Sequence, residues 1–210
     1  MSGTRSTAAS SRPRPASWWS SSSVLVVLDQ WRLSADGQVQ ASGTTVDVRL
    51  VAASSHWRIT ALHPATPGRS SAVLPAPADA VLGNPRIRLP YAARADIASG
   101  QVHGSVLSAL RQLATRYVLD VSVVRSGHPI YVFGTDRPSD HPRGRAVDIW
   151  ALDDRPVVLP SNRASVERAM RVAATVGPYQ VGGPVDLDDG GSQYFSDPTH
   201  QDHLHLGFRT

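Results

Sequence analysis

Side chains that bind metals gather in two short stretches near the C-terminal end of this 210-residue chain. The first stretch, Ser139 to Asp148, has the pattern S-x-H-x-x-G-x-A-x-D and contains His141. The second follows much later with the pattern H-x-x-H-x-H, formed by His200, His203 and His205. A fold that uses these groups together must bring the two stretches side by side. This requirement constrains the fold more than any other feature of the sequence.

The residue types in these stretches suit zinc. Imidazole and carboxylate are zinc ligands, and the chain contains no cysteine, so thiolate sites and a cysteine nucleophile are excluded. Two histidines and one aspartate would leave the fourth tetrahedral position open for water, which is typical of catalytic zinc. Gly144 permits a sharp turn, which can carry His141 back over the start of a strand that bears Asp148. The sequence therefore predicts a catalytic zinc site.

The two C-terminal histidines of the second stretch are expected to share a face. On a β-strand, residues i and i+2 point to the same side, so His203 and His205 can reach one metal and its water. One of them can bind the metal while the other contacts the water or the substrate. A single histidine is more often an ordinary surface or core residue, so only the joint pattern favours a metal site. Four histidines lie outside the patterns. His56, His63 and His103 are expected to have no part in the site, whereas the stretch 126–129, which contains His128 and follows the strand over 118–124, is expected to line the substrate groove.

Composition limits the class of protein and its partners. Hydrophobic residues make up 41% of the chain and charged residues 18%, which favours a folded core. The net charge of +4 suits an anionic partner, but no basic run or basic-aromatic cluster is present, so nucleic acid is not an expected partner. No apolar run approaches the ~18 residues of a membrane helix. The apolar stretch 24–28 is shorter than a signal-peptide core of ~7–15 residues, so no signal peptide is predicted. The oligomeric state is not indicated.

The chain is expected to divide into four parts. Residues 1–22 are rich in Ser, Arg and Pro and are predicted to be disordered. Residues 23–63 alternate apolar and polar side chains, which predicts a small β-meander. Residues 64–90 are dense in proline and are predicted to form an extended linker. Residues 91–210 form the main domain, whose expected elements are helices over 105–114 and 161–176 and strands over 118–124, 145–152 and 203–208.

The motif stretches resemble a known group of enzymes. The stretch from Ser139 to Asp148 resembles the signature of the zinc D-Ala-D-Ala carboxypeptidases and dipeptidases. The sequence Asp-Ile-Trp at 148–150 and the H-x-x-H-x-H pattern resemble the penicillin-insensitive murein endopeptidases. Both groups belong to one superfamily of peptidoglycan-cleaving zinc peptidases, whose fold is also that of the Hedgehog signalling domain. The resemblance covers residues 90–208 and implies an α+β fold, an antiparallel sheet with flanking helices, preceded here by the meander.

The resemblance also implies roles for particular residues. It implies three zinc ligands, His141, Asp148 and His205, with His203 near the zinc-bound water. The carboxypeptidase branch has a glutamate as general base three residues before the last ligand, where this chain has the shorter Asp202. The endopeptidase branch lacks that glutamate and has a histidine where His200 stands. The general base is therefore Asp202, His200 or His203, and the sequence does not choose among them.

Zinc chemistry completes the expected mechanism. Zinc lowers the pKa of its bound water and polarises the scissile carbonyl, while a base transfers the proton to the leaving amine. A cation should stabilise the oxyanion or bind a substrate carboxylate, and the candidates are Arg125 and Arg137. The expected activity is hydrolysis of D-Ala-containing bonds in peptidoglycan peptide stems, as a carboxypeptidase or an endopeptidase. Because peptidoglycan lies outside the cytoplasm, the expected location is the cell envelope or the medium.

Other functions remain open at this point. A non-catalytic zinc-containing binding module at the cell envelope would keep the fold and the metal. The presence of all three candidate bases favours an enzyme over that module. A zinc amidase or an L,D-peptidase would share the ligand chemistry and differ only in the shape of its pocket. A structural envelope protein would carry the motif by coincidence, and metal analysis would identify that case.

Overall fold

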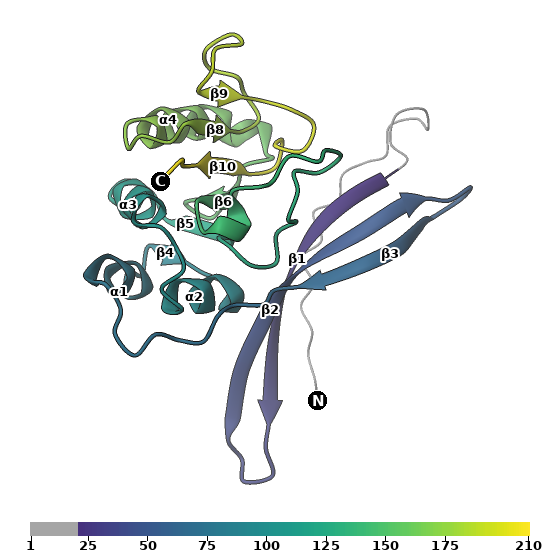
Figure 1. Cartoon of the computed structure of the whole chain (residues 1–210), viewed down its shortest axis with the longest axis vertical. Helices are drawn as coiled ribbons and strands as arrows, with labels where there is room; N and C mark the ends of the chain where they lie inside the picture. The colour runs from purple at the N-terminus through teal and green to yellow at the C-terminus, as the bar shows by residue number, and fades with distance from the viewer. Residues whose placement is uncertain (1–20) are drawn as a thin grey trace.

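The computed structural model describes residues 21–210 (Figure 1). The chain is mixed α+β, with a three-stranded sheet at its beginning and a seven-stranded sheet with four α-helices in its main body. The segment expected to be disordered, residues 1–22, lies outside the described residues except for its last two, which begin strand β1. Within the described part, no helix has the length and apolar character needed to cross a bilayer.

Three antiparallel strands form the small sheet: β1 (Ser21–Leu33), β2 (Val39–Ala52) and β3 (Trp57–Pro64). The alternation along residues 46–50 places Asp47, which is fully buried, on one face of the strand and Val46 and Val48 on the opposite face. The turn between β1 and β2 contains Gly37 at φ +81°, a conformation that glycine adopts without strain. Strands β1 and β2 therefore form a hairpin at this glycine, and Figure 1 shows it extending away from the main body.

The small sheet is docked on the main domain through close backbone contacts. A Cβ added at Gly43 of β2 would lie 2.7 Å from Cδ2 of Tyr91, the first residue of helix α2 (Tyr91–Ala98). A Cβ added at Gly127 would lie 3.0 Å from the backbone oxygen of Thr45. Glycine at both positions allows β2 to approach helix α2 and the loop after residue 124. The small sheet therefore packs directly against helix α2 and this loop of the main domain.

The segment predicted to be an extended linker, residues 64–90, contains regular structure. Helix α1 (Ala76–Leu82) begins after Pro75, and strand β4 (Ile87–Arg88) follows it. Val81 is 0% exposed and Ile87 is 3% exposed, so both belong to the core. The prediction of a linker is therefore wrong over these elements. The physical reason is that proline is well tolerated in the first turn of a helix, where its missing N–H has no intrahelical partner.

The large sheet has the strand order β4-β5-β6-β10-β8-β9, and β7 pairs with β6. Its other strands are β5 (Leu119–Val123), β6 (Ala146–Leu152), β7 (Arg155–Pro156), β8 (Gln180–Gly182), β9 (Tyr194–Phe195) and β10 (Leu204–Gly207). The central pairs are antiparallel, as expected, whereas β4–β5 and β8–β9 are parallel. The sheet is therefore mixed. Helices α2 and α3 (Gly104–Ala114) connect β4 to β5, and a crossover of this kind joins parallel strands.

Helices cover the sheet and close its core. The expected helices are present as α3 and α4 (Arg163–Ala174), and both turn an apolar face to the sheet. Leu110 of α3, Met170 of α4 and Leu204 of β10 are all 0% exposed and belong to one core cluster. The alternate residues of β10 point away from that cluster. This places His205 on the opposite face, where the metal-binding side chains gather.

The revised role of the 64–90 segment can be tested by mutation. Ile87→Ala should lower the free energy of unfolding by about 2–5 kcal/mol, because it removes buried methyl groups from the core. Val73→Ala in the same segment is the control, since Val73 is 81% exposed and should change stability by less than ~0.5 kcal/mol. Urea unfolding followed by circular dichroism measures both. Equal, small effects of the two substitutions would show that this segment is a linker after all.

Candidate metal centre

A tight turn presents His141 to the interior of the domain. His141–Arg143 form one turn of 3-10 helix, which ends at Gly144 with φ 69°. A Cβ at Gly144 would lie 2.0 Å from the backbone oxygen of Gln101, so a larger residue could not occupy this position without a shift of the backbone. The hydroxyl oxygen of Ser139 accepts a hydrogen bond from the backbone N–H of His141 at 3.3 Å, so Ser139 forms part of the turn. His141 is 0% exposed.

Strand pairing brings His205 to the same place. In the register of β10 with β6, His205 lies directly opposite Asp148. The Nδ1 atom of His205 is 2.9 Å from Oδ1 of Asp148 and 3.3 Å from Nε2 of His141. The third side of this triangle, from His141 Nε2 to Asp148 Oδ1, is 3.2 Å. The structure therefore brings together all three residues that the sequence predicted as ligands.

The hydrogen bonding of His141 determines which atoms of the triangle carry protons. Its Nδ1–H donates to the backbone oxygen of Val124 at 2.8 Å, so Nε2 of the neutral ring carries a lone pair. In this neutral form, Nε2 of His141 faces a carboxylate oxygen of Asp148 at 3.2 Å and both atoms are acceptors, whereas a protonated ring would donate Nε2–H to that carboxylate. With both imidazoles neutral, only Nδ1 of His205 can bring a proton into the triangle. A bound cation would satisfy all three lone pairs, so the donor set fits a metal ion.

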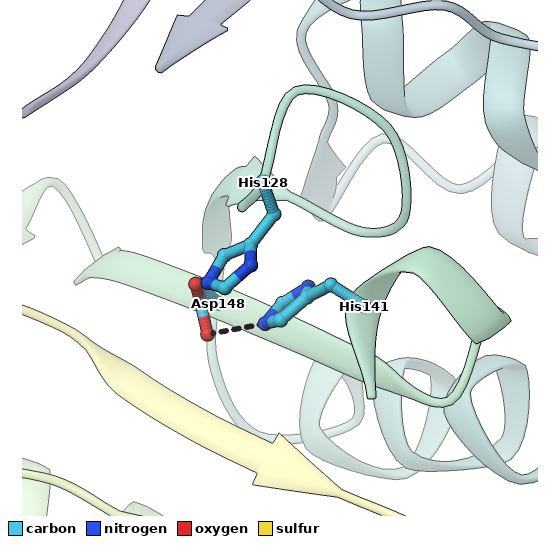
Figure 2. A group of neighbouring side chains, drawn as sticks. All are labelled: His128, His141 and Asp148. Carbon is cyan, nitrogen blue, oxygen red and sulfur yellow. Dashed lines mark ion pairs between the residues drawn. The ribbon is translucent and has the colours of Figure 1, made fainter. Parts of the chain in front are cut away.

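The loop that follows β5 adds a fourth side chain, His128 (Figure 2). Donor atoms of His128, His141 and Asp148 lie within 4.8 Å of one another, and this buried group can hold a metal ion. The rings of His128 and His141 are stacked, with centroids 4.0 Å apart. Sequence reasoning assigned residues 126–129 to the substrate groove and missed this proximity. The sequence indicated only that this loop follows a strand, and that position does not tell where the loop places the ring of His128.

Burial and charge set the protonation states in this centre. Burial opposes ionisation of Asp148, but the neighbouring charges of His141 and His203 and its hydrogen bonds outweigh burial and hold its pKa well below 3.8. Burial lowers the pKa of His205 to about 4, although its hydrogen bond to Asp148 acts in the opposite direction. Burial also lowers the pKa of His128 well below 6.5. At neutral pH the carboxylate is therefore ionised and these two imidazoles are neutral, which are the states that bind metals.

Two histidine–aspartate pairs lie beside the triangle. His203 has its Nδ1 2.8 Å from Oδ1 of Asp202, and its Nε2 is 3.8 Å from Oδ1 of Asp148. His200 has its Nδ1 2.7 Å from Oδ1 of Asp197. Strand β10 begins only at Leu204, so the segment that carries Asp202 is irregular and its carboxylate can turn toward His203. All three candidate bases are therefore present near the centre, and His203 is the one within 4 Å of Asp148.

The two candidate arginines are placed differently. Arg125 follows β5 directly, and its guanidinium is 3.7 Å from Oδ1 of the buried Asp96. Arg137 is exposed on the loop between Ile130 and Ser139. Within residues 21–210, neither guanidinium forms an ion pair with Asp148. The roles proposed for both arginines stay predictions.

A second hydrogen bond holds the turn that carries His141. The hydroxyl of Tyr179, located just before β8, donates to a carboxylate oxygen of Asp140. Burial of the phenol and this hydrogen bond to Asp140 raise the pKa of Tyr179 to about 12. The neutral phenol is therefore the stable form, and it links the turn to the strand that neighbours β10.

Comparisons of this chain with models of protein families, with curated proteins and with solved structures give no match. The assignment of a function therefore depends on the geometry of the centre and on the sequence motifs. The geometry by itself identifies one group that can hold a metal ion, formed by His128, His141 and Asp148, and it places Nδ1 of His205 beside that group.

Metal content provides the direct test of this centre. The purified chain, loaded with excess Zn²⁺ and dialysed, should retain about one ion, and His141→Ala should retain none, because the substitution removes a buried donor. The matched control is His56→Ala, since His56 is exposed in the turn between β2 and β3 and should leave metal content unchanged. Elemental mass spectrometry gives the stoichiometry. A His141→Ala protein with the parent's metal content would contradict the assignment.

Proposed function

We propose that this chain is a zinc-dependent peptidase of the D-Ala-D-Ala carboxypeptidase and murein endopeptidase superfamily, which hydrolyses D-Ala-containing bonds in peptidoglycan stems. The observation that carries the proposal is the triangle of donor atoms of His141, Asp148 and His205, whose sides measure 3.2, 2.9 and 3.3 Å. Ligand atoms ~2.0–2.1 Å from a tetrahedral zinc ion are separated by about 3.3 Å. The two sequence patterns supply these three residues, and a fourth pattern residue, His203, lies beside them.

Ring orientation favours His205 over His128 as the third ligand. A metal lies near the plane of an imidazole, along the lone pair of its nitrogen. The planes of His128 and His141 are 16° apart in a stack, so they do not converge on one point near both nitrogens. The planes of His141 and His205 are 55° apart, which allows their lone pairs to converge. His128 then forms the wall of the centre on the side of the loop.

Three ligands leave one zinc position for chemistry. When bound, zinc supplies a Lewis acid that polarises the scissile carbonyl and acidifies water. The chain's own contribution is proton transfer by His203, whose Nε2 points toward Asp148 and whose Nδ1 is held by Asp202. Nε2 of His203 can take a proton from the attacking water and deliver it to the leaving amine. Asp202 orients the ring and stabilises the imidazolium form, as carboxylates do for catalytic histidines.

The alternative bases are less well directed. His200 is bound through Nδ1 to Asp197, and its ring packs edge-on against Phe195 with centroids 4.7 Å apart. Asp202 contacts the ring of His203 and so acts through it. We therefore assign the base to His203, Asp202 as its positioning residue, and His200 to the wall of the site.

Substrate and location follow from the same proposal. The substrate is the peptide stem of peptidoglycan, and carboxypeptidase and endopeptidase activity are both compatible with the centre. Action on peptidoglycan requires an envelope or extracellular location. The specific Hedgehog/DD-peptidase fold, with its central antiparallel strands β5, β6, β10 and β8, is part of this proposal.

Hydrolysis assays with matched variants test the activity. The zinc-loaded parent should cleave a D-Ala-D-Ala-ended muropeptide, as measured by liquid chromatography and mass spectrometry. His205→Ala should lose both zinc and cleavage, whereas His128→Ala should keep zinc, because the ring of His128 is stacked away from the point of convergence. Zinc bound by the parent without any cleavage would instead favour a non-catalytic binding module. A parent without zinc would contradict the proposal altogether.

The assignment of the base is tested by substitutions beside the ligands. His203→Ala should lower kcat by roughly 10²–10⁴-fold, the usual contribution of a general base, with zinc content retained. Asp202→Asn should lower kcat less and alter the pH profile, since it keeps the hydrogen bond to His203 but removes the charge. His200→Ala should stay within about tenfold of the parent. A larger loss in His200→Ala than in His203→Ala would transfer the role of base to His200.

A further inference from the structure

A pocket of about 520 Å³ opens between the small sheet and the loop after β5. Its lining comes from β2, from the end of β3 and from residues 125–135, with Pro142 beside them. His128 belongs both to this pocket and to the metal group, since its ring stacks on His141 at a centroid distance of 4.0 Å. The pocket therefore begins one ring away from the metal group.

The small sheet contributes a fixed arginine to this pocket. Nε of Arg49 donates to Oδ2 of Asp47 at 2.7 Å, and Asp47 is 0% exposed. The guanidinium carbon of Arg49 also lies 5.2 Å from the ring centroid of Phe133, across the pocket's loop wall. These two contacts hold the planar group in one orientation. Among the guanidinium nitrogens of Arg49, only Nε forms a hydrogen bond within the described residues, so the two terminal amino groups are available to a ligand.

A second arginine is fixed on the opposite side by the same kind of contact. Arg125 lines the pocket, and its guanidinium is 3.7 Å from the carboxylate of Asp96, which is 0% exposed. That carboxylate also accepts hydrogen bonds from the backbone N–H of Arg125 and from the N–H and hydroxyl of Ser126. The side chains of Arg49 and Arg125 remain 25% and 22% exposed. The lining of one pocket thus contains two partly exposed arginines, each held by a buried carboxylate.

We propose that this pocket binds a free carboxylate of the peptide substrate, with Arg49 of the small sheet as its specificity-determining residue and Arg125 as its partner. The inference rests on the proposed peptidase function. Guanidinium groups bind carboxylates through two parallel hydrogen bonds, and an arginine already held in place loses little entropy when it does so. His63, for which the sequence predicted no role, lines the same pocket and closes its edge at the end of β3. The small sheet thus forms a wall of the substrate site.

Two peptides that differ only in their C-terminal group, a carboxylate or an amide, test the proposal. The zinc-loaded full chain is given a D-Ala-D-Ala-ended peptide with a free C-terminal carboxylate, or the same peptide as its amide. Arg49→Gln should lower kcat/KM for the acid roughly 10–100-fold, the loss typical of a charge-assisted hydrogen bond, and leave the amide unchanged. Arg49→Lys should recover part of the loss. Arg58→Gln, on the exposed part of β3, is the matched control and should behave as the parent.

A binding measurement separates this proposal from the proposed catalysis. Calorimetry with the metal-free chain should show that the acid peptide binds more tightly than the amide, and that Arg49→Gln removes the difference. If the parent lacks zinc and activity but keeps this preference, the peptidase proposal fails and the carboxylate pocket stands. If the parent cleaves both peptides equally and Arg49→Gln has no effect, the pocket fails and the peptidase stands. A fall in thermal stability with equal losses on both peptides would reduce Arg49 to a structural contact and overturn the proposal.

Discussion

The convergence of the metal-binding atoms of His141, Asp148 and His205 is the constraint on which the rest of this structure depends. Nε2 of His141 and Oδ1 of Asp148 face each other at 3.2 Å in a buried place, and both are acceptors whenever the ring of His141 is neutral. Burying unpaired polar groups is costly unless hydrogen bonds or a cation compensate. The register of β10 against β6, the left-handed turn at Gly144 and the bond from His141 to Val124 all hold this arrangement. A cation bound at this point would compensate the buried polar atoms that these features bring together.

The centre is built from elements that are distant along the chain, and each of them contributes a different kind of control. Strands β6 and β10 fix the spacing of Asp148 and His205, because cross-strand partners have a set separation. The turn before β6 sets the direction of His141, and the hydrogen bond from Tyr179 to Asp140 holds that turn. The irregular segment before β10 lets Asp202 reach His203. Ligand geometry is thus controlled by the sheet, whereas the proposed proton transfer is controlled by a loop.

The small N-terminal sheet is part of the same arrangement. Close approach of β2 at Gly43 and at Gly127 brings the sheet against helix α2 and against the loop that carries His128. That contact creates the pocket and places Arg49 and Arg125 along it. The buried Asp47 and Asp96 each hold one arginine. A peptidase domain with this additional wall would select its substrates with residues that lie outside the motif-bearing part of the chain.

The local patterns were informative for elements with a clear period. Alternation over 46–50 identified a strand, and apolar residues at helical spacing identified α3 and α4. The prolines of 64–90 led to the wrong prediction of a linker, because proline occurs both in linkers and in the first turn of helices. Only the burial of Val81 and Ile87 distinguishes the two cases. The sheet was expected to be antiparallel, yet its edge pairs are parallel, since the direction of a short strand such as β4 depends on its connections.

The sequence by itself determined which residues can form the centre: the spacing of His141, Gly144 and Asp148, and the alternation of His203 and His205, are local properties. It also determined that sulfur takes no part. Only the tertiary structure decided that His128 joins the metal-binding group and that His203 is paired with Asp202. It also decided that residues of the small sheet line the pocket next to His128. The reason is that these contacts form between segments that do not share a strand or a helix. Their meeting is set by packing, which no local pattern encodes.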